Sequence, residues 1–115
     1  MIRIQRSKSK VYKKTRMILD RIYPTLKNFP KSEKYSLCAE IKKEFFTLIK
    51  YLLLADKVPS KRKSYQEQAD GHLQVCKALL DLAYSRHYIN EGFFEEISIE
   101  LTEVGFILSA WIKKS

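Results

Sequence analysis

Lysine and arginine side chains recur at helical spacing in the first half of the chain, and this arrangement suits phosphate binding. Lys43, Lys50 and Lys57 are seven residues apart, which on a helix places one side chain every two turns, about 10 Å apart. Each phosphate that such a cation neutralises adds salt-dependent affinity. Further basic side chains share helix flanks or follow one another directly: Lys10, Lys13, Lys14, Arg16, Arg21, Lys61, Arg62 and Lys63.

Charge is distributed unevenly along the chain. Residues 1–63 carry 18 Lys and Arg against 5 Asp and Glu, a net charge of +13, whereas residues 64–115 carry 4 against 8, a net charge of −4. The first half therefore favours a polyanion such as RNA or DNA, bound through its phosphates. The alternative interpretation is a solvated lysine face that only keeps the protein soluble.

Two other side-chain groups suggest chemistry only weakly. His72 and Cys76 form an i, i+4 pair that would need a third metal ligand such as Cys38, but this spacing is common by chance and core or boundary packing is the favoured interpretation. A cluster of glutamates is interpreted as a solvated helix face or as a counter-surface for lysines of another subunit: Glu95, Glu96, Glu100 and Glu103. Because no nucleophile or pocket pattern accompanies them, we expect no metal, no cofactor and no enzyme activity.

The elements that position these side chains are predicted to be helices, because Gly and Pro are scarce and apolar residues recur at steps of three and four. We predict one domain over 1–115, with a basic arm at 1–9 and helices at about 10–29, 33–56, 61–86 and 91–114. Ser32 and Asn90 are the expected N-caps, and Pro24 should kink the first helix. Short connections then favour an all-α, antiparallel up-down-up-down four-helix bundle.

The chain offers no apolar run long enough to cross a membrane, and its basic start lacks the apolar stretch of a secretory signal. We therefore expect a cytoplasmic protein without a membrane partner. Apolar residues also exceed what one bundle core needs, and their pairing on several helices indicates self-association. The expected oligomer interface comprises Phe46, Ile49, Leu53, Val75, Leu82, Ile99 and Phe106.

Two segments, residues 65–83 and 103–113, carry a family resemblance. Residues 65–73 have the pattern Y-x3-A-D-x2-L, residues 79–83 read L-L-x-L-A, and residues 103–113 have the pattern E-V-G-x2-L-x2-W-I-K. These patterns resemble the third and fourth helices of the Avd family, the accessory variability determinants of diversity-generating retroelements. That family is related to four-helix-bundle proteins encoded in intervening sequences of 23S ribosomal RNA genes.

The resemblance implies a basic, ring-shaped homopentamer that binds RNA and DNA and partners a reverse transcriptase in mutagenic retrohoming. Together with the lysine pattern, it leads to the hypothesis of a non-enzymatic, nucleic-acid-binding, homo-oligomeric accessory protein. The alternative hypothesis is a structural helical-bundle adaptor that binds protein only and has no nucleic-acid activity.

Overall fold

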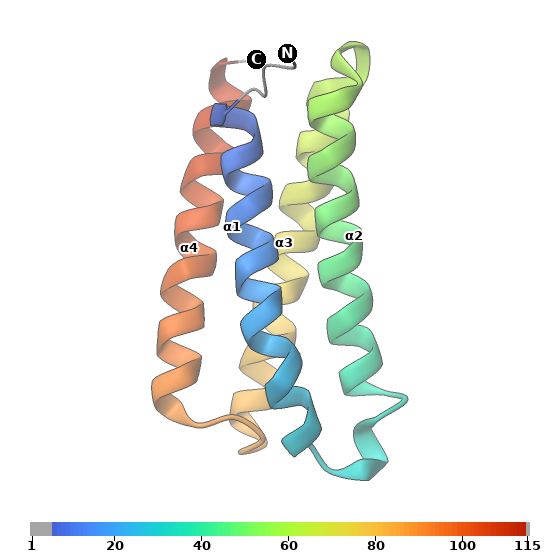
Figure 1. The fold of residues 1–115 in the computed structure, drawn as a ribbon, viewed down its shortest axis with the longest axis vertical. Coiled ribbons are helices and arrows are strands. Elements are labelled where there is room, and N and C mark those ends of the chain that lie inside the picture. Colours follow the sequence, from blue (N-terminus) through green and yellow to red (C-terminus); the bar gives the residue numbers. More distant parts are fainter. Residues whose placement is uncertain (1–5, 115) are drawn as a thin grey trace.

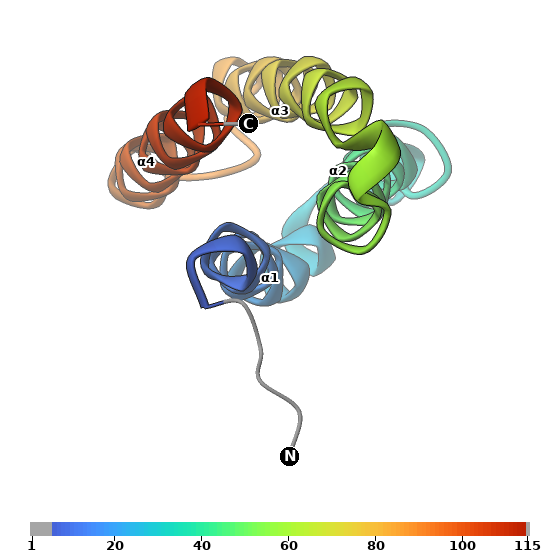
Figure 2. The same ribbon diagram turned by 90° about the horizontal axis from the view of Figure 1, so that it is seen from above.

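The computed structural model describes residues 6–114, which form four α-helices: α1 (Arg6–Thr25), α2 (Leu37–Lys57), α3 (Arg62–Ser85) and α4 (Glu91–Lys114). Consecutive helices run in opposite directions, so that α4 ends at the same end of the bundle where α1 begins (Figure 1). Seen down the long axis, α1, α2, α3 and α4 follow one another in order around the bundle (Figure 2). This arrangement confirms the predicted all-α, up-down-up-down four-helix bundle.

The first helix begins earlier than the sequence pattern predicted. Residues 6–9 are the first turn of α1 and are not part of an arm, while the rest of the predicted arm, 1–5, lies outside the described residues. The segment contains no Gly or Pro, and Lys and Arg are good helix formers, so nothing in it stops the helix from extending.

Pro24 lies in the last turn of α1. Because proline has no backbone N–H, the residue cannot donate to the carbonyl one turn earlier. The α-helix ends at the next residue and continues as the short 3-10 helix η1 (Leu26–Asn28). Phe29 is then extended, with φ −72° and ψ 154°, as expected for a residue before proline.

The second helix begins four residues later than predicted, and Ser32 is not its N-cap. A separate 3-10 helix, η2 (Lys31–Glu33), follows Pro30, and α2 starts only at Leu37. The carboxylate of Glu33 accepts a hydrogen bond from Ser36 Oγ at 2.6 Å and one from the Leu37 amide at 3.4 Å. Glu33 therefore caps α2 from outside the helix, a contact that its position in the chain did not reveal.

The turn between α3 and α4 has regular caps at both ends. His87 has φ 64°, its amide donates to Tyr84 O, and the Tyr88 amide donates to Ala83 O, which together form a Schellman motif. Asn90 then caps α4 as predicted, because its Oδ1 accepts from the Phe93 amide at 2.8 Å.

One apolar core joins all four helices, and it contains the stripes predicted from the sequence. Its largest fully buried apolar side chains are Val11, Ile18, Ile22, Ile41, Phe45, Leu48, Leu52, Leu73, Ile97, Leu101 and Leu108. The bundle measures 44 × 28 × 25 Å. No helix within residues 6–114 combines the length and apolar character that crossing a bilayer requires.

We predict that His87→Gly stabilises the protein. A side chain in the left-handed region is strained, whereas glycine adopts it freely, although glycine also gains entropy in the unfolded chain. The expected net gain is about 0.5–1 kcal/mol in the free energy of unfolding, measured by urea denaturation. Ala78→Gly, at an exposed helical position of α3, is the control and should cost about 1 kcal/mol. A His87→Gly protein less stable than the wild type would contradict the prediction.

Candidate nucleic-acid interface

Lys43, Lys50 and Lys57 form an exposed row along α2, which we call the lysine row. Within the described part of the chain, the only carboxylate at ion-pair distance from the row is Asp56, 4.0 Å from Lys57 Nζ. Lys50 Nζ lies 5.3 Å from the centre of the Tyr51 ring. The row therefore presents cationic groups to solvent along more than half of α2.

Three of the predicted basic residues on the neighbouring helix α1 are also exposed, namely Lys10, Lys13 and Arg16. The Arg16 guanidinium lies 5.8 Å from the centre of the Tyr12 ring. Their exposure leaves these cations accessible to a polyanion.

Lys14 and Arg21, by contrast, are engaged within the bundle. Lys14 Nζ is 2.9 Å from Glu103 Oε1. Arg21 Nη1 donates to both oxygens of Glu100 at 2.6 Å, and Nη2 donates to Glu96 at 2.8 Å. The hydrogen bond with Glu100 raises the pKa of Arg21 above its ordinary value, as do the charges of both glutamates. The acidic face of α4 thus meets cations of its own chain, and these two side chains connect α1 to α4.

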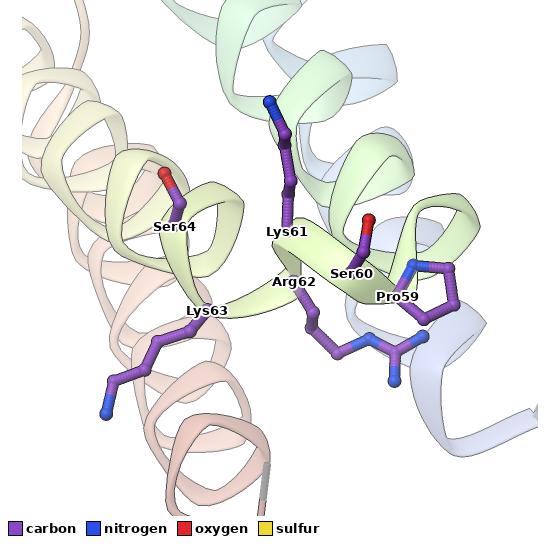
Figure 3. A pocket seen from close by; sticks show the side chains of 6 residues that line it. All are labelled: Pro59, Ser60, Lys61, Arg62, Lys63 and Ser64. Carbon is purple, nitrogen blue, oxygen red and sulfur yellow. The ribbon is translucent and has the colours of Figure 1, made fainter.

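The predicted triplet at the α2–α3 turn does not converge on one point. Arg62 caps the end of α2, with Nε donating to Ala55 O at 2.7 Å and Nη2 to Asp56 O at 3.1 Å. Lys61 and Lys63 are exposed and point in opposite directions from the chain (Figure 3). Each lysine can meet a separate phosphate, but Arg62 serves the turn itself.

A second basic group, which the sequence pattern did not reveal, lies at the opposite end of α2. A cleft of about 370 Å³ lies between the end of α1 and the start of α2, with Tyr23 on its wall. Its cationic lining consists of Lys27, Lys31, Lys34 and Lys42. The spacing of these lysines, at four, three and eight residues, can be read from the sequence. Their position around one cleft depends on how the turn between the helices folds.

The apolar residues predicted for an oligomer interface are mostly solvent-exposed in the single chain. Phe46, Ile99 and Phe106 have exposed fractions of 51%, 62% and 71%, and the remaining exposed members are Leu53, Val75 and Leu82. Ile49 differs, because it is half-buried and packs against the core. Ile99 and Phe106 line a shallow groove on α4 together with Ser98 and Thr102. Three further exposed large hydrophobic side chains were not predicted for this interface, namely Met17, Tyr23 and Tyr35.

His72 and Cys76, weighed as metal ligands, have other surroundings. His72 Nδ1 lies 2.7 Å from Glu44 Oε1, and its ring stacks on Tyr51 with centres 5.6 Å apart. Cys76 and Cys38 are both buried, and burial raises the pKa of each thiol. Across residues 6–114, no three His, Cys, Asp or Glu side chains come together as a metal site would require.

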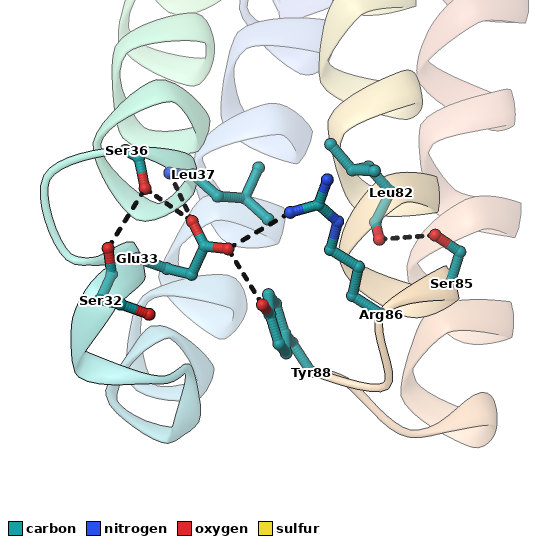
Figure 4. A network of polar contacts seen from close by, with 8 residues as sticks. All are labelled: Ser32, Glu33, Ser36, Leu37, Leu82, Ser85, Arg86 and Tyr88. Carbon is teal, nitrogen blue, oxygen red and sulfur yellow. Dashed lines mark hydrogen bonds and ion pairs between the residues drawn. The ribbon is translucent and has the colours of Figure 1, made fainter.

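Glu33 organises the end of the bundle next to the cleft. Its Oε2 accepts from the Tyr88 hydroxyl at 2.9 Å and lies 3.4 Å from Arg86 Nη1, so it joins the start of α2 to the end of α3 (Figure 4). The hydrogen bond from Ser36, followed by that from Tyr88, lowers the pKa of Glu33. The carboxylate is therefore held in its charged form and faces these partners.

The chain matches the family model described as bAvd-like over residues 10–115. The chain belongs to the bAvd-like family. No curated protein and no solved structure matched the chain. The matched range contains α2, α3 and α4 entirely and α1 from Lys10 onward, so it includes the lysine row and the exposed apolar residues of α4.

Family membership identifies the protein as an accessory protein of the Avd type. It agrees with the resemblance drawn from residues 65–83 and 103–113, most of whose apolar positions the structure places in the core. Most apolar residues of these two segments are therefore packing positions. The lysine row and the exposed Ile99 and Phe106 lie outside the family pattern, whereas the exposed Leu82 lies within it.

We predict that Glu33→Gln reduces stability at neutral pH and makes the protein less sensitive to acid. Because the folded pKa of Glu33 is lowered, its carboxylate stabilises the fold above its ordinary pKa of about 4.3, and this contribution is lost as pH falls through the folded value. The difference in urea unfolding free energy between wild type and variant should therefore shrink from pH 7 to pH 3. A wild-type-to-variant difference in unfolding free energy that stays constant between pH 7 and pH 3 would contradict the prediction. Glu67→Gln, at an exposed position of α3, is the control.

Proposed function

We propose that this Avd-type accessory protein binds RNA or DNA through phosphate contacts, with the lysine row of α2 as the main contact surface. The observation that supports this most directly is that the three ammonium groups are exposed while α4 carboxylates already pair with Lys14 and Arg21. Asp56 lies 4.0 Å from Lys57 Nζ, but no carboxylate of the described chain comes within ion-pair distance of Lys43 or Lys50, so the row keeps charge that the fold does not neutralise. Exposed cations at helical spacing suit a phosphate backbone better than a specific base sequence.

In this proposal the protein acts as a homo-oligomer. The family resemblance makes five the expected number of copies. Exposed apolar side chains on three helices support self-association, because burying them on a second copy removes apolar area from water. An oligomer also gathers several lysine rows, so a weak surface on one chain becomes avid in the assembly. A reverse transcriptase is the proposed protein partner.

The proposed role includes no chemical step. Both thiols are buried, His72 is engaged by Glu44, and Glu96, Glu100 and Glu103 pair with cations of α1. The protein would act by displaying charge and by holding its partners together. The second candidate function is a protein-binding adaptor. The exposed Ile99 and Phe106 favour it, because exposed apolar residues can bind the surface of a different protein as readily as that of a second copy of this chain.

We predict that the triple variant Lys43→Glu/Lys50→Glu/Lys57→Glu abolishes RNA and DNA binding at moderate salt and leaves folding and assembly intact. Each lost phosphate contact should lower the slope of log affinity against log salt by about 0.9 on a duplex. The measurement is fluorescence anisotropy of a labelled oligonucleotide titrated with protein at several salt concentrations.

Two control variants test whether the position of the charge matters: one keeps the positive charge of the lysine row, and the other reverses charge elsewhere. Substituting Arg at the same three positions preserves charge and should preserve binding. Lys113→Glu/Lys114→Glu alters charge at the end of α4 and should weaken binding much less. Unchanged binding by the triple Glu variant would refute the lysine row as the contact surface, and a wild type that binds nothing even at low salt would support the adaptor.

We predict that the wild type has a solution mass near five times 13.6 kDa by light scattering. Ile99→Asp/Phe106→Asp should reduce this mass, because a carboxylate cannot be buried unpaired in an apolar contact. Tyr35→Asp, at another exposed aromatic residue, is the control and should leave the mass unchanged. A wild-type monomer at both low and moderate salt would contradict the oligomer.

A further inference from the structure

The cleft between α1 and α2 combines positive charge with an apolar floor. Its volume of about 370 Å³ lies at the small end of the range of about 300–1,000 Å³ typical of small-molecule sites. Leu26, Phe29 and Cys38 are buried and form part of its lining. Around them stand Lys27, Lys31, Lys34 and Lys42, which come from η1, η2, the following turn and α2.

No carboxylate lines this cleft, and none of its four lysines has a carboxylate within 4 Å among the described residues. Glu33 is the acidic residue closest in sequence, between Lys31 and Lys34. Its oxygens are occupied instead by Ser36, the Leu37 amide and Tyr88. Positive charge is therefore concentrated in the cleft, while the nearby Glu33 carboxylate is bound to other partners. Such a cleft favours an anionic ligand.

The wall of the cleft carries a flat aromatic surface. Tyr23 is 41% exposed, and Lys42 Nζ lies 5.3 Å from the centre of its ring. Phe46, also exposed, lies one turn beyond Lys42, with its ring centre 6.4 Å from that of Tyr23. An aromatic ring beside several ammonium groups matches a ligand that has both a flat base and a phosphate.

We infer that this cleft binds one unpaired nucleotide of an RNA or DNA strand, with the base against Tyr23 and the phosphate among the lysines. This inference rests on the proposed nucleic-acid binding and adds a preference for unpaired over paired strands. A base inside a duplex is stacked between its neighbours, so its face cannot meet Tyr23 unless it leaves the helix. The lysine row, in contrast, contacts phosphates that both kinds of strand carry.

The test compares one labelled single strand with the duplex of the same sequence, both titrated with the full chain. Tyr23→Leu should weaken single-strand binding about 10-fold, which corresponds to the loss of one base–aromatic stack, and leave duplex binding unchanged. Tyr23→Phe, which keeps the ring, should bind as the wild type does. Lys31→Gln/Lys34→Gln should reduce the salt dependence of single-strand binding more than that of duplex binding.

Tyr35→Leu is the matched control, because Tyr35 also has a lysine against its ring, with Lys34 Nζ 5.4 Å from the centre, but lies outside the cleft lining. It should bind both strands as the wild type does. Thermal unfolding of Tyr23→Leu, Tyr23→Phe and Tyr35→Leu verifies that each is folded.

Four results would overturn the inference. The first two concern Tyr23→Leu: single-strand binding equal to that of the wild type, or an equal loss of affinity for single strand and duplex. The third is an effect of Tyr35→Leu on single-strand binding as large as that of Tyr23→Leu. The fourth is competition for single-strand binding by an acidic peptide but not by a nucleoside monophosphate. Duplex binding that depends on the lysine row would in each case leave the proposed function standing. A wild type that binds neither strand would remove the proposed function and this inference together.

Discussion

Four apolar helix faces must be buried on one another, and the short turns between the helices allow this only when each helix reverses the direction of the one before it. That constraint returns α4 to the side of α1, so the most acidic helix lies beside a strongly basic one. Arg21 and Lys14 then meet Glu96, Glu100 and Glu103 across the contact. The charge that α4 neutralises is on α1, and Lys43, Lys50 and Lys57 on α2 stay exposed.

At the end of the bundle that holds the α1–α2 and α3–α4 connections, polar contacts add to the apolar packing. Glu33 caps α2 and connects it to Tyr88 and Arg86, while His87 closes α3 in a left-handed conformation. These contacts hold the α1–α2 connection in a defined shape. The cleft lined by lysines and Tyr23 is formed in part by that connection, since Lys31 and Lys34 on either side of Glu33 are among its lining residues.

The bAvd-like protein therefore has two kinds of cationic surface that differ in shape. The lysine row is extended and lies on one helix, which suits a phosphate backbone of either form. The cleft is compact and includes an aromatic ring, which suits one exposed base. In an oligomer held together by exposed apolar residues, each copy would add one of each, and a strand could contact several copies at once.

The sequence by itself determined the helix number, the core stripes and the family, because these depend on local periodicity and on packing positions that leave a regular pattern. The row Lys43, Lys50 and Lys57 was predictable for the same reason, since all three are on one helix. Only the tertiary structure decided which cations are engaged, because Arg21 is 75 residues before Glu96 and meets it only when the bundle closes. The Tyr23 cleft and the Glu33 cap were likewise hidden, because both depend on how a turn folds between two helices.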